Sequence, residues 1–204
     1  MACCLILPGL HDSGPDHWQT RWVAGRDDCA RVELGRWSQP SRTLWVSRLD
    51  RAIGRAAAPV VLVAHSLACH AVAWWAADAS LARLEKVRGA LLVAPPDVDR
   101  AEAVTELSPF APTATGRLPF RSILAASRDD RYASFARQAW LADRWGSELV
   151  DFGRQGHLNA DSRLGDWIEG QQLLRSLLLQ QPVTVVASAG VAGEGARPGR
   201  TGAA

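Results

Sequence analysis

VVLVAHSLACHAV, residues 60–72, passes from a run of branched aliphatic residues directly into a segment of helical spacing. A short run of this kind predicts a strand that is buried on both faces. The segment after it is apolar nearly all round and continues to the adjacent Trp74 and Trp75, which predicts the central, most buried helix of the fold. Only His65 and Ser66 separate the two elements, so we expect a tight turn there.

Similar runs recur along the chain and alternate with helical segments. The other short apolar runs are CCLIL (3–7), ARVEL (30–34), RGALLVA (88–94), RSILAA (121–126) and ELVDF (148–152). The segments with helical spacing are 16–25, 41–57, 67–80, 131–146 and 162–180. Strands that alternate with helices predict βαβ units and a parallel sheet covered on both sides. We expect an α/β protein, a three-layer α/β/α sandwich with about six parallel strands in the order 2-1-3-4-5-6.

Length and composition are those of an ordinary globular protein. The chain has 204 residues, of which 48% are apolar and 22% are charged, and one hydrophobic core is sufficient for this length. From Pro182 onward the residues are mostly small, with many glycines and no helical period. We predict one domain at 1–181 and a disordered C-terminal tail at 182–204.

Charge and hydropathy argue against two classes of partner. The chain has 23 basic and 21 acidic side chains, and its arginines are scattered along the sequence, which argues against nucleic-acid binding. No stretch reaches the ~20 apolar residues of a membrane helix, and the start has no basic region of the kind that opens a signal peptide. We expect a cytoplasmic protein without a membrane partner.

Two groups of side chains were candidates for binding metals. The cysteines are Cys3, Cys4, Cys29 and Cys69. They have neither zinc-type spacing nor the density of a disulfide scaffold, and their apolar surroundings predict reduced, buried thiols. The second group comprises His11, Asp12, Asp16 and His17, whose spacing matches no familiar metal site. Since no G-x-G-x-x-G or Walker loop is present either, we expect no metal and no organic cofactor.

The turn at Ser66 has the position of a nucleophile elbow. In such an elbow the serine takes a strained backbone conformation that exposes Oγ at the start of a helix, and the flanking residues must be small. The usual pattern is G-x-S-x-G, whereas the flanking residues here are Ala64 and Ala68. The pattern favours a nucleophile at Ser66, although a serine that only caps a buried helix can have the same local sequence.

The loop LPGLHDSG, residues 7–14, is a candidate for stabilising the negative oxygen that forms during acyl transfer. In the expected strand order the first and third strands are neighbours, and the loops that leave them diverge at the topological switch point. This order places the loop beside Ser66. We expect an oxyanion hole formed by the backbone amide of Leu10 or His11 together with that of Leu67.

A serine nucleophile needs a base, and in this fold the partners follow in the chain order serine, acid, histidine. Four histidines precede the serine, adjoin it or lie on the buried helix: His11, His17, His65 and His70. Only His157 follows acidic candidates, in a Gly-flanked loop after the last strand. We therefore predict that His157 is the general base.

The acid of such a triad is expected on the loop after the fifth strand. There the stretch RSILAASRDDRYAS contains two adjacent aspartates, Asp129 and Asp130. Paired carboxylates on a loop are usually only solvated, but together with Ser66 and His157 either one completes a triad. Of the two, we prefer Asp130.

Three motifs resemble those of the small serine hydrolase family that includes retinoblastoma-binding protein nine and the bacterial YdeN-type proteins. They are LPGLHDSGPDHWQTRW, VLVAHSLACHAVAWW, and SRDD with GHLNADS, and the resemblance covers residues 4–180. It implies that the family's serine, aspartate and histidine fall on Ser66, Asp130 and His157, because the family's acid is the second of the paired aspartates. Ala68 departs from the family, which commonly has glycine there.

The resemblance further implies a minimal α/β-hydrolase fold without a substantial lid, and a carboxylic ester hydrolase whose natural substrate is open. With the triad, it predicts that Ser66 attacks a small-molecule acyl substrate and that no cofactor is needed. Two alternatives remain. One is a catalytically weak or inactive module that binds a protein partner or another ligand, although the sequence does not indicate a partner. The other is transfer of the acyl group to an acceptor other than water.

Overall fold

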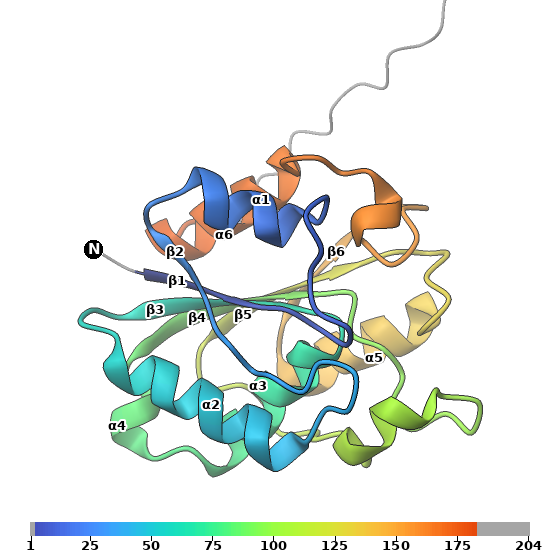
Figure 1. Cartoon of the computed structure of the whole chain (residues 1–204), viewed down its shortest axis with the longest axis horizontal. Coiled ribbons are helices and arrows are strands. Elements are labelled where there is room, and N and C mark those ends of the chain that lie inside the picture. The colour runs from blue at the N-terminus through green and yellow to red at the C-terminus, as the bar shows by residue number, and fades with distance from the viewer. Residues whose placement is uncertain (1–2, 183–204) are drawn as a thin grey trace, which may run out of the picture.

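A computed structural model describes residues 3–182, in which six parallel strands form one sheet between two layers of helices (Figure 1). The strand order is β2-β1-β3-β4-β5-β6. The strands are β1 (Cys3–Leu7), β2 (Cys29–Arg31), β3 (Val60–His65), β4 (Val87–Val93), β5 (Arg121–Ala126) and β6 (Glu148–Asp151). The predicted fold class and strand order are confirmed. The tail predicted at 182–204 lies, apart from Pro182, outside the described residues.

Helices α1 and α6 cover one face of the sheet, and α2, α3 and α5 cover the other (Figure 1). The α-helices are α1 (Trp18–Gly25), α2 (Arg42–Arg55), α3 (Leu67–Asp78), α4 (Leu81–Leu84), α5 (Phe135–Trp145) and α6 (Ile168–Leu179). The 3-10 helices are η1 (Thr105–Phe110) and η2 (Ala160–Ser162). Within residues 3–182, no helix is both long enough and apolar enough to cross a bilayer.

Helix α3 is the most buried helix, as its apolar sequence predicts. It follows β3, in which every residue is buried, and eight of its own twelve residues are buried. The buried imidazole of His70 donates from Nε2 to the carbonyl of Pro96 at 2.8 Å, and burial lowers the pKa of this ring to about 4. The neutral ring therefore connects α3 to the segment after β4 without placing a charge in the core.

The two edge strands differ from the prediction that every strand is buried on both faces. β2 has only three residues, and neither β2 nor β6 contains a buried residue. Each has a strand neighbour on one side only, because they lie at the two ends of the strand order. Their sequences resemble those of the inner strands, so the exposure depends on their place in the sheet.

Two predicted helices begin four or more residues later than their sequence pattern indicates. The helix expected at 131–146 begins at Phe135, where the side chain of Ser134 accepts a backbone N–H of the first turn at 3.1 Å. The helix expected at 162–180 begins at Ile168. In both cases, the residues before the helix belong to loops at the carboxyl end of the sheet.

The order of the strands gathers several loops at this carboxyl end. β1 and β3 are neighbours although β2 lies between them in sequence, so the connections that leave them run in opposite directions. The chain segments that begin where β1, β3, β5 and β6 end include residues 8–17, Ser66, residues 127–134 and residues 152–160. These segments contain every residue that the sequence predicts for a catalytic triad.

Candidate active site

Ser66 lies in the turn between β3 and α3 and has a backbone conformation that L residues rarely adopt. Its φ is 55° and its ψ is −127°. Its N–H donates to the carbonyl of Val93 on the neighbouring β4 at 2.8 Å, immediately before the helix begins. The flanking Ala64 and Ala68 are fully buried, so larger side chains would overpack both sites. The turn has the strained strand-to-helix conformation that is expected of a nucleophile elbow.

A side chain at position 9 would collide with this turn. A Cβ on Gly9 would lie 2.8 Å from the Cβ of Ser66 and 2.9 Å from the carbonyl oxygen of His65. Neither atom can move away unless the backbone of the turn moves too. Glycine therefore allows the loop after β1 to lie directly against Ser66. The sequence predicts this loop beside the serine but does not single out Gly9, because its importance depends on how closely two distant segments approach.

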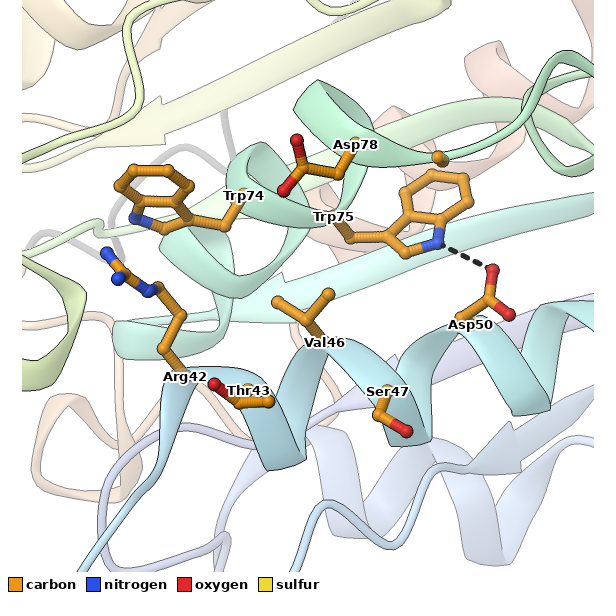
Figure 2. Close-up of a pocket in the computed structure, with 9 residues that line it drawn as sticks. Arg42, Thr43, Val46, Ser47, Asp50, Trp74, Trp75 and Asp78 are labelled. Carbon is orange, nitrogen blue, oxygen red and sulfur yellow. Dashed lines mark hydrogen bonds between the residues drawn. The ribbon is translucent and has the colours of Figure 1, made fainter.

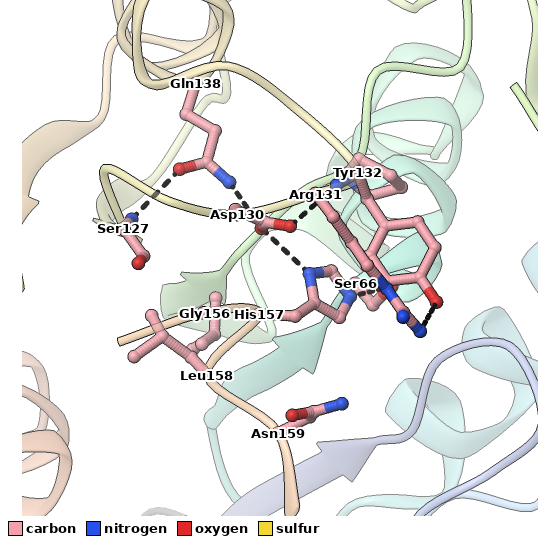
Figure 3. A network of polar contacts seen from close by, with 12 residues as sticks. Ser66, Ser127, Asp130, Arg131, Tyr132, Gln138, Gly156, His157, Leu158 and Asn159 are labelled. Atoms are coloured by element: carbon pink, nitrogen blue, oxygen red, sulfur yellow. Dashed lines mark hydrogen bonds and ion pairs between the residues drawn. The ribbon is translucent and has the colours of Figure 1, made fainter. Parts of the chain in front are cut away.

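Ser66, His157 and Asp130 form a continuous chain of hydrogen bonds (Figure 3). Nε2 of His157 lies 2.9 Å from Oγ of Ser66, and Nδ1 lies 2.8 Å from Oδ2 of Asp130. An ionised carboxylate only accepts, so Nδ1 carries the hydrogen and Nε2 accepts from the serine hydroxyl. The Asp130 side chain is fully shielded from solvent, and that of His157 is 9% exposed. The structure thus brings together the three residues expected from the sequence.

Asp129 takes no part in this chain of hydrogen bonds. Its Oδ1 accepts from the N–H of Gly156 at 2.8 Å and from the hydroxyl of Ser127 at 3.0 Å. The hydrogen bond from Gly156 lowers the pKa of the Asp129 carboxyl. Of the two adjacent aspartates, Asp130 contacts His157. Asp129 instead binds Gly156, the residue before His157, and so holds the loop that carries this histidine.

Gln138 on α5 holds the carboxylate of Asp130 from the side opposite Ser66 (Figure 3). Its Nε2 donates at 2.9 Å to Oδ2 of Asp130, the oxygen that also accepts from His157. Its Oε1 accepts from the N–H of Ser127 at 3.1 Å. Because a backbone N–H can only donate, this second bond fixes which end of the amide faces the carboxylate. Gln138 is fully buried, and the sequence pattern did not identify it.

Two ring N–H groups hold the loop that carries His157. His65 donates from Nε2 to the carbonyl of His157 at 3.0 Å, and Trp18 donates from Nε1 to the carbonyl of Leu158 at 2.9 Å. Burial lowers the pKa of His65 well below its ordinary value, so this imidazole is neutral. The ring of Tyr132 packs against that of His157, with centroids 4.4 Å apart. These contacts restrict His157 to the orientation in which it reaches the serine.

The loop after β1 is fastened by the buried side chain of Gln19. Its Nε2 donates to the carbonyl of Leu7 at 3.1 Å and to that of Val63 at 3.2 Å. Its Oε1 accepts from the hydroxyl of Ser13 at 2.7 Å. One amide on α1 therefore joins the ends of β1 and β3 to the loop between residues 8 and 14.

The oxyanion hole expected from the sequence changes in one member. The N–H of His11 donates to the carbonyl of Trp37 at 2.9 Å, so it is not available to a substrate. Across residues 3–182, the backbone N–H groups of Leu10 and Leu67 donate to no backbone carbonyl. Leu10 also lines the same cavity as Ser66. The expectation of Leu10 or His11 therefore narrows to Leu10, together with Leu67.

Two cavities adjoin His157. One has a volume of about 230 Å³ and is lined among others by Ser66, His157, Leu10, Pro96, Leu107 and Tyr132. The other, of about 350 Å³, is more polar and is lined among others by Arg131, Arg154, Asn159, Asp161 and His157. His157 and Asn159 therefore line both a small, mixed cavity and a more polar one.

A larger cavity of about 420 Å³ lies between α2 and α3, away from the triad (Figure 2). Two of its charged groups, those of Asp50 and Arg42, have partners within the chain. The carboxylate of Asp50 accepts from Nε1 of Trp75 at 3.1 Å, and the guanidinium of Arg42 lies 4.2 Å from the ring centroid of Trp74. None of its lining residues belongs to the triad, so its size alone does not make it the reactive site.

Two of the four potential metal ligands near the start of the chain have other contacts. Asp12 forms an ion pair with Arg31, and Nδ1 of His17 accepts from the N–H of Gln19 at 3.2 Å as the N-cap of α1. Among residues 3–182, no three His, Cys, Asp or Glu side chains are grouped so that they could hold a metal ion.

Solved structures similar to this chain include two YdeN-type proteins. A YdeN-like hydrolase from Pectobacterium atrosepticum is 28% identical, with 89% of this chain and 94% of that chain covered and a TM-score of 0.77. The ydeN gene product of B. subtilis is 20% identical, with 88% and 100% covered and a TM-score of 0.67. Est1E from Butyrivibrio proteoclasticus, solved with ferulic acid bound, shares the fold at 9% identity, with 89% of both chains covered and a TM-score of 0.63.

Sequence comparisons point to the same group of proteins. No curated protein matches the chain. A family model, however, matches residues 4–176 and describes a serine hydrolase. Because this match spans most of the 204 residues, the chain belongs to the serine hydrolase family.

Proposed function

We propose that this serine hydrolase cleaves small carboxylic esters through an acyl-enzyme on Ser66, with His157 as general base and Asp130 orienting the histidine. The observation that carries the proposal is the chain of hydrogen bonds, 2.9 Å and 2.8 Å long, that begins at the strained serine turn. Membership of the serine hydrolase family supports a hydrolytic reaction.

In the first half-reaction, Oγ of Ser66 attacks the carbonyl carbon of the ester while its proton moves to Nε2 of His157. The imidazolium then gives this proton to the departing alcohol as the ester C–O bond breaks, and the acyl group stays on the serine. The carboxylate of Asp130 stabilises the imidazolium through Nδ1. The amides of Leu10 and Leu67 stabilise the negative oxygen of the tetrahedral intermediate.

In the second half-reaction, water takes the place of the alcohol. The water oxygen attacks the acyl carbon while His157 accepts a proton from the water. His157 then gives this proton to Oγ of Ser66 as the carboxylic acid leaves. All groups required for this cycle belong to the chain, so the proposal includes no metal or organic cofactor.

Two further imidazoles lie near His157, and both are neutral in this mechanism. The ring centroid of His65 lies 5.0 Å from that of His157 and 4.7 Å from that of His17. Burial lowers the pKa of His17 to about 4 and that of His65 well below its ordinary value. At neutral pH these rings therefore add no positive charge that would oppose protonation of His157.

We expect short acyl chains to react fastest. The cavity beside Ser66 has a volume of about 230 Å³, which is room for roughly eight groups the size of a water molecule. The kcat/KM for p-nitrophenyl acetate or butyrate should therefore exceed that for the decanoate by about tenfold or more, since each 1.4 kcal/mol of misfit is a factor of about ten. Leu107→Ala, which widens this cavity, should move the preference toward longer chains. Faster cleavage of the decanoate by the unaltered chain would contradict this.

Gln138 is expected to act as a positioning residue for the triad. In Gln138→Leu the amide that fixes Asp130 is lost, and we expect kcat to fall by about 10- to 100-fold with little change in KM, the loss of one hydrogen bond to a charged group. Gln138→Glu places a second carboxylate beside Asp130, which raises the pKa of the introduced group. Once protonated, that group can again donate to Asp130. The activity of Gln138→Glu relative to that of the wild type should therefore recover as the pH is lowered.

The pH profile separates positioning from a general loss of stability. Asp143→Asn, at an exposed position on the same helix, serves as the matched control and should keep the wild-type rate and pH profile. A kcat for Gln138→Leu equal to that of the control would show that Asp130 needs no support from α5.

The proposed function is tested with a fluorophosphonate probe and intact-protein mass spectrometry. One adduct per chain, mapped by peptide fragmentation to Ser66, is expected because only an activated serine attacks the phosphorus centre rapidly. If the folded chain forms no adduct and cleaves no ester, the alternative of a ligand-binding module replaces this proposal.

A further inference from the structure

Two cysteines face each other at the edge of the sheet, far in sequence from the triad. Cys4 on β1 and Cys29 on β2 are direct partners in the strand register. Partners in register point to the same side of a sheet. Cys4 belongs to the core cluster beneath α1 and α6, and the partly buried Cys29 packs against this cluster. The two thiols form a hydrogen bond with each other.

This arrangement is within reach of a disulfide. Neighbouring strands lie about 4.8 Å apart, and disulfides join Cα atoms that are about 4.4 to 6.8 Å apart. The N–H of Cys4 also donates to the carbonyl of Asp28 at 2.7 Å, which holds β2 against β1 at the position of the cysteine pair. An S–S bond could therefore form without a change in strand pairing.

The two thiols differ in exposure and in acidity. Cys4 is fully buried, whereas Cys29 is partly exposed. The hydrogen bond from Cys4 lowers the pKa of Cys29. Partial burial and the carboxylate of Asp28 oppose this effect, and the guanidinium of Arg26 adds to it. The same hydrogen bond, followed by burial, raises the pKa of Cys4. Cys29 thus has the character of an attacking thiolate and Cys4 that of a resolving thiol.

Cys69 provides the contrast within the same molecule. It is fully buried, and burial raises its pKa well above the ordinary value. The sequence leads us to expect buried thiols at every cysteine, and Cys69 fits this expectation. Cys29 does not, because it lies on the short edge strand, where the sheet gives it only partial cover.

We propose that Cys4 and Cys29 are a peroxide-sensitive thiol pair that closes to a disulfide, a modification site separate from the proposed ester hydrolysis. The thiolate of Cys29 attacks hydrogen peroxide, an S–O bond forms as the O–O bond breaks, and the released hydroxide takes up a proton to become water. The thiol of Cys4 then attacks the sulfenic sulfur, forming the S–S bond and releasing a second water. Each disulfide consumes one peroxide, which is reduced by the two electrons that the sulfurs lose.

The pair is also connected to the loop beside the triad. β2 continues from Cys29 to Arg31, whose guanidinium forms an ion pair with the carboxylate of Asp12 in the loop after β1. Asp12 lines the cavity that contains Ser66. A disulfide would fix β2, the strand that carries Arg31. Oxidation therefore takes place two residues away from an ion pair that holds the loop beside Ser66.

The experiment treats the 204-residue chain with a small molar excess of hydrogen peroxide, blocks remaining thiols with N-ethylmaleimide and maps the cross-links by fragmentation mass spectrometry. Before blocking, the expected product has lost two hydrogen atoms, and dithiothreitol should restore the starting mass of this unblocked sample. After blocking under denaturing conditions, the product contains a Cys4–Cys29 link, and Cys69 carries N-ethylmaleimide because it was still a thiol. This measurement needs no variant, so it does not depend on how well a substituted chain folds.

Single substitutions then identify the role of each sulfur. Cys4→Ser should stop at a sulfenic acid on Cys29 that dimedone traps, Cys29→Ser should form no disulfide, and Cys69→Ser should behave as the wild type. A Cys4–Cys29 pair that stays reduced while Cys69 is oxidised, or a disulfide formed by the neighbouring Cys3 instead of Cys4, would overturn the proposal. Ester hydrolysis enters none of these readouts, so failure here leaves the proposed function untouched.

Discussion

Replacing Ser66 by alanine is expected to lower kcat for ester hydrolysis by about a millionfold, the loss seen when a serine nucleophile is removed from a triad. The substitution removes Oγ, the atom that lies 2.9 Å from Nε2 of His157 and that forms the acyl bond in the proposed mechanism. Alanine keeps the Cβ, so the turn with φ of 55° meets no new steric demand. The measurement is kcat on p-nitrophenyl acetate, together with thermal unfolding of both proteins.

The fold should survive this change. Ser66 donates its backbone N–H to Val93, and alanine retains this bond. A matched control is Ser47→Ala, since Ser47 lines the cavity between α2 and α3 and is remote from the triad. Ser47→Ala should keep full activity and fluorophosphonate labelling, and Ser66→Ala should lose both at a similar melting temperature. If Ser66→Ala retained more than a few per cent of the rate, the nucleophile would be another residue.

Asp130→Asn is expected to lower kcat by about ten-thousandfold, as in triads whose aspartate is replaced by asparagine. Oδ2 of Asp130 accepts from both His157 and Gln138, and Oδ1 accepts from the N–H of Tyr132 at 2.8 Å. Asparagine has only one oxygen, so its NH₂ group must face donors on one side of the site. If it faces His157, Nδ1 becomes the acceptor, Nε2 carries the hydrogen, and the ring can no longer accept the serine proton.

The neighbouring aspartate provides the matched control. Asp129→Asn removes the same charge one residue earlier, from a carboxylate that binds Gly156 and Ser127 but does not contact His157. We expect it to lower kcat only a few-fold, through the looser attachment of the loop, which is the loss of one ordinary hydrogen bond. The comparison requires kcat and KM for both variants under one set of conditions. The reverse ranking would assign the acid to Asp129.

Much of the fold follows from local chemistry in the chain. The valine-rich run before Ser66 and the apolar segment after it favour a strand and a buried helix wherever they are placed, and small residues on both sides of the serine permit the tight turn. The alternation of strands and helices then restricts the sheet to parallel pairing, because right-handed crossovers leave few other arrangements. Chain order predicts His157 as the base, since it is the histidine that comes after the acidic candidates, and the family resemblance supports the preference for Asp130 over Asp129.

Other features depend on segments that meet only in the folded chain. Gln138 reaches Asp130 because α5 packs beside the loop after β5, and no spacing rule distinguishes it from a surface glutamine. The backbone N–H of His11, one of the donors expected for an oxyanion hole, instead donates to the carbonyl of Trp37, and Gly9 matters because Ser66 lies against it. Local conformational preferences act over a few residues and can be predicted from the sequence. Long-range hydrogen-bond partners and close approaches depend on the distances between remote segments, and only tertiary packing sets these distances.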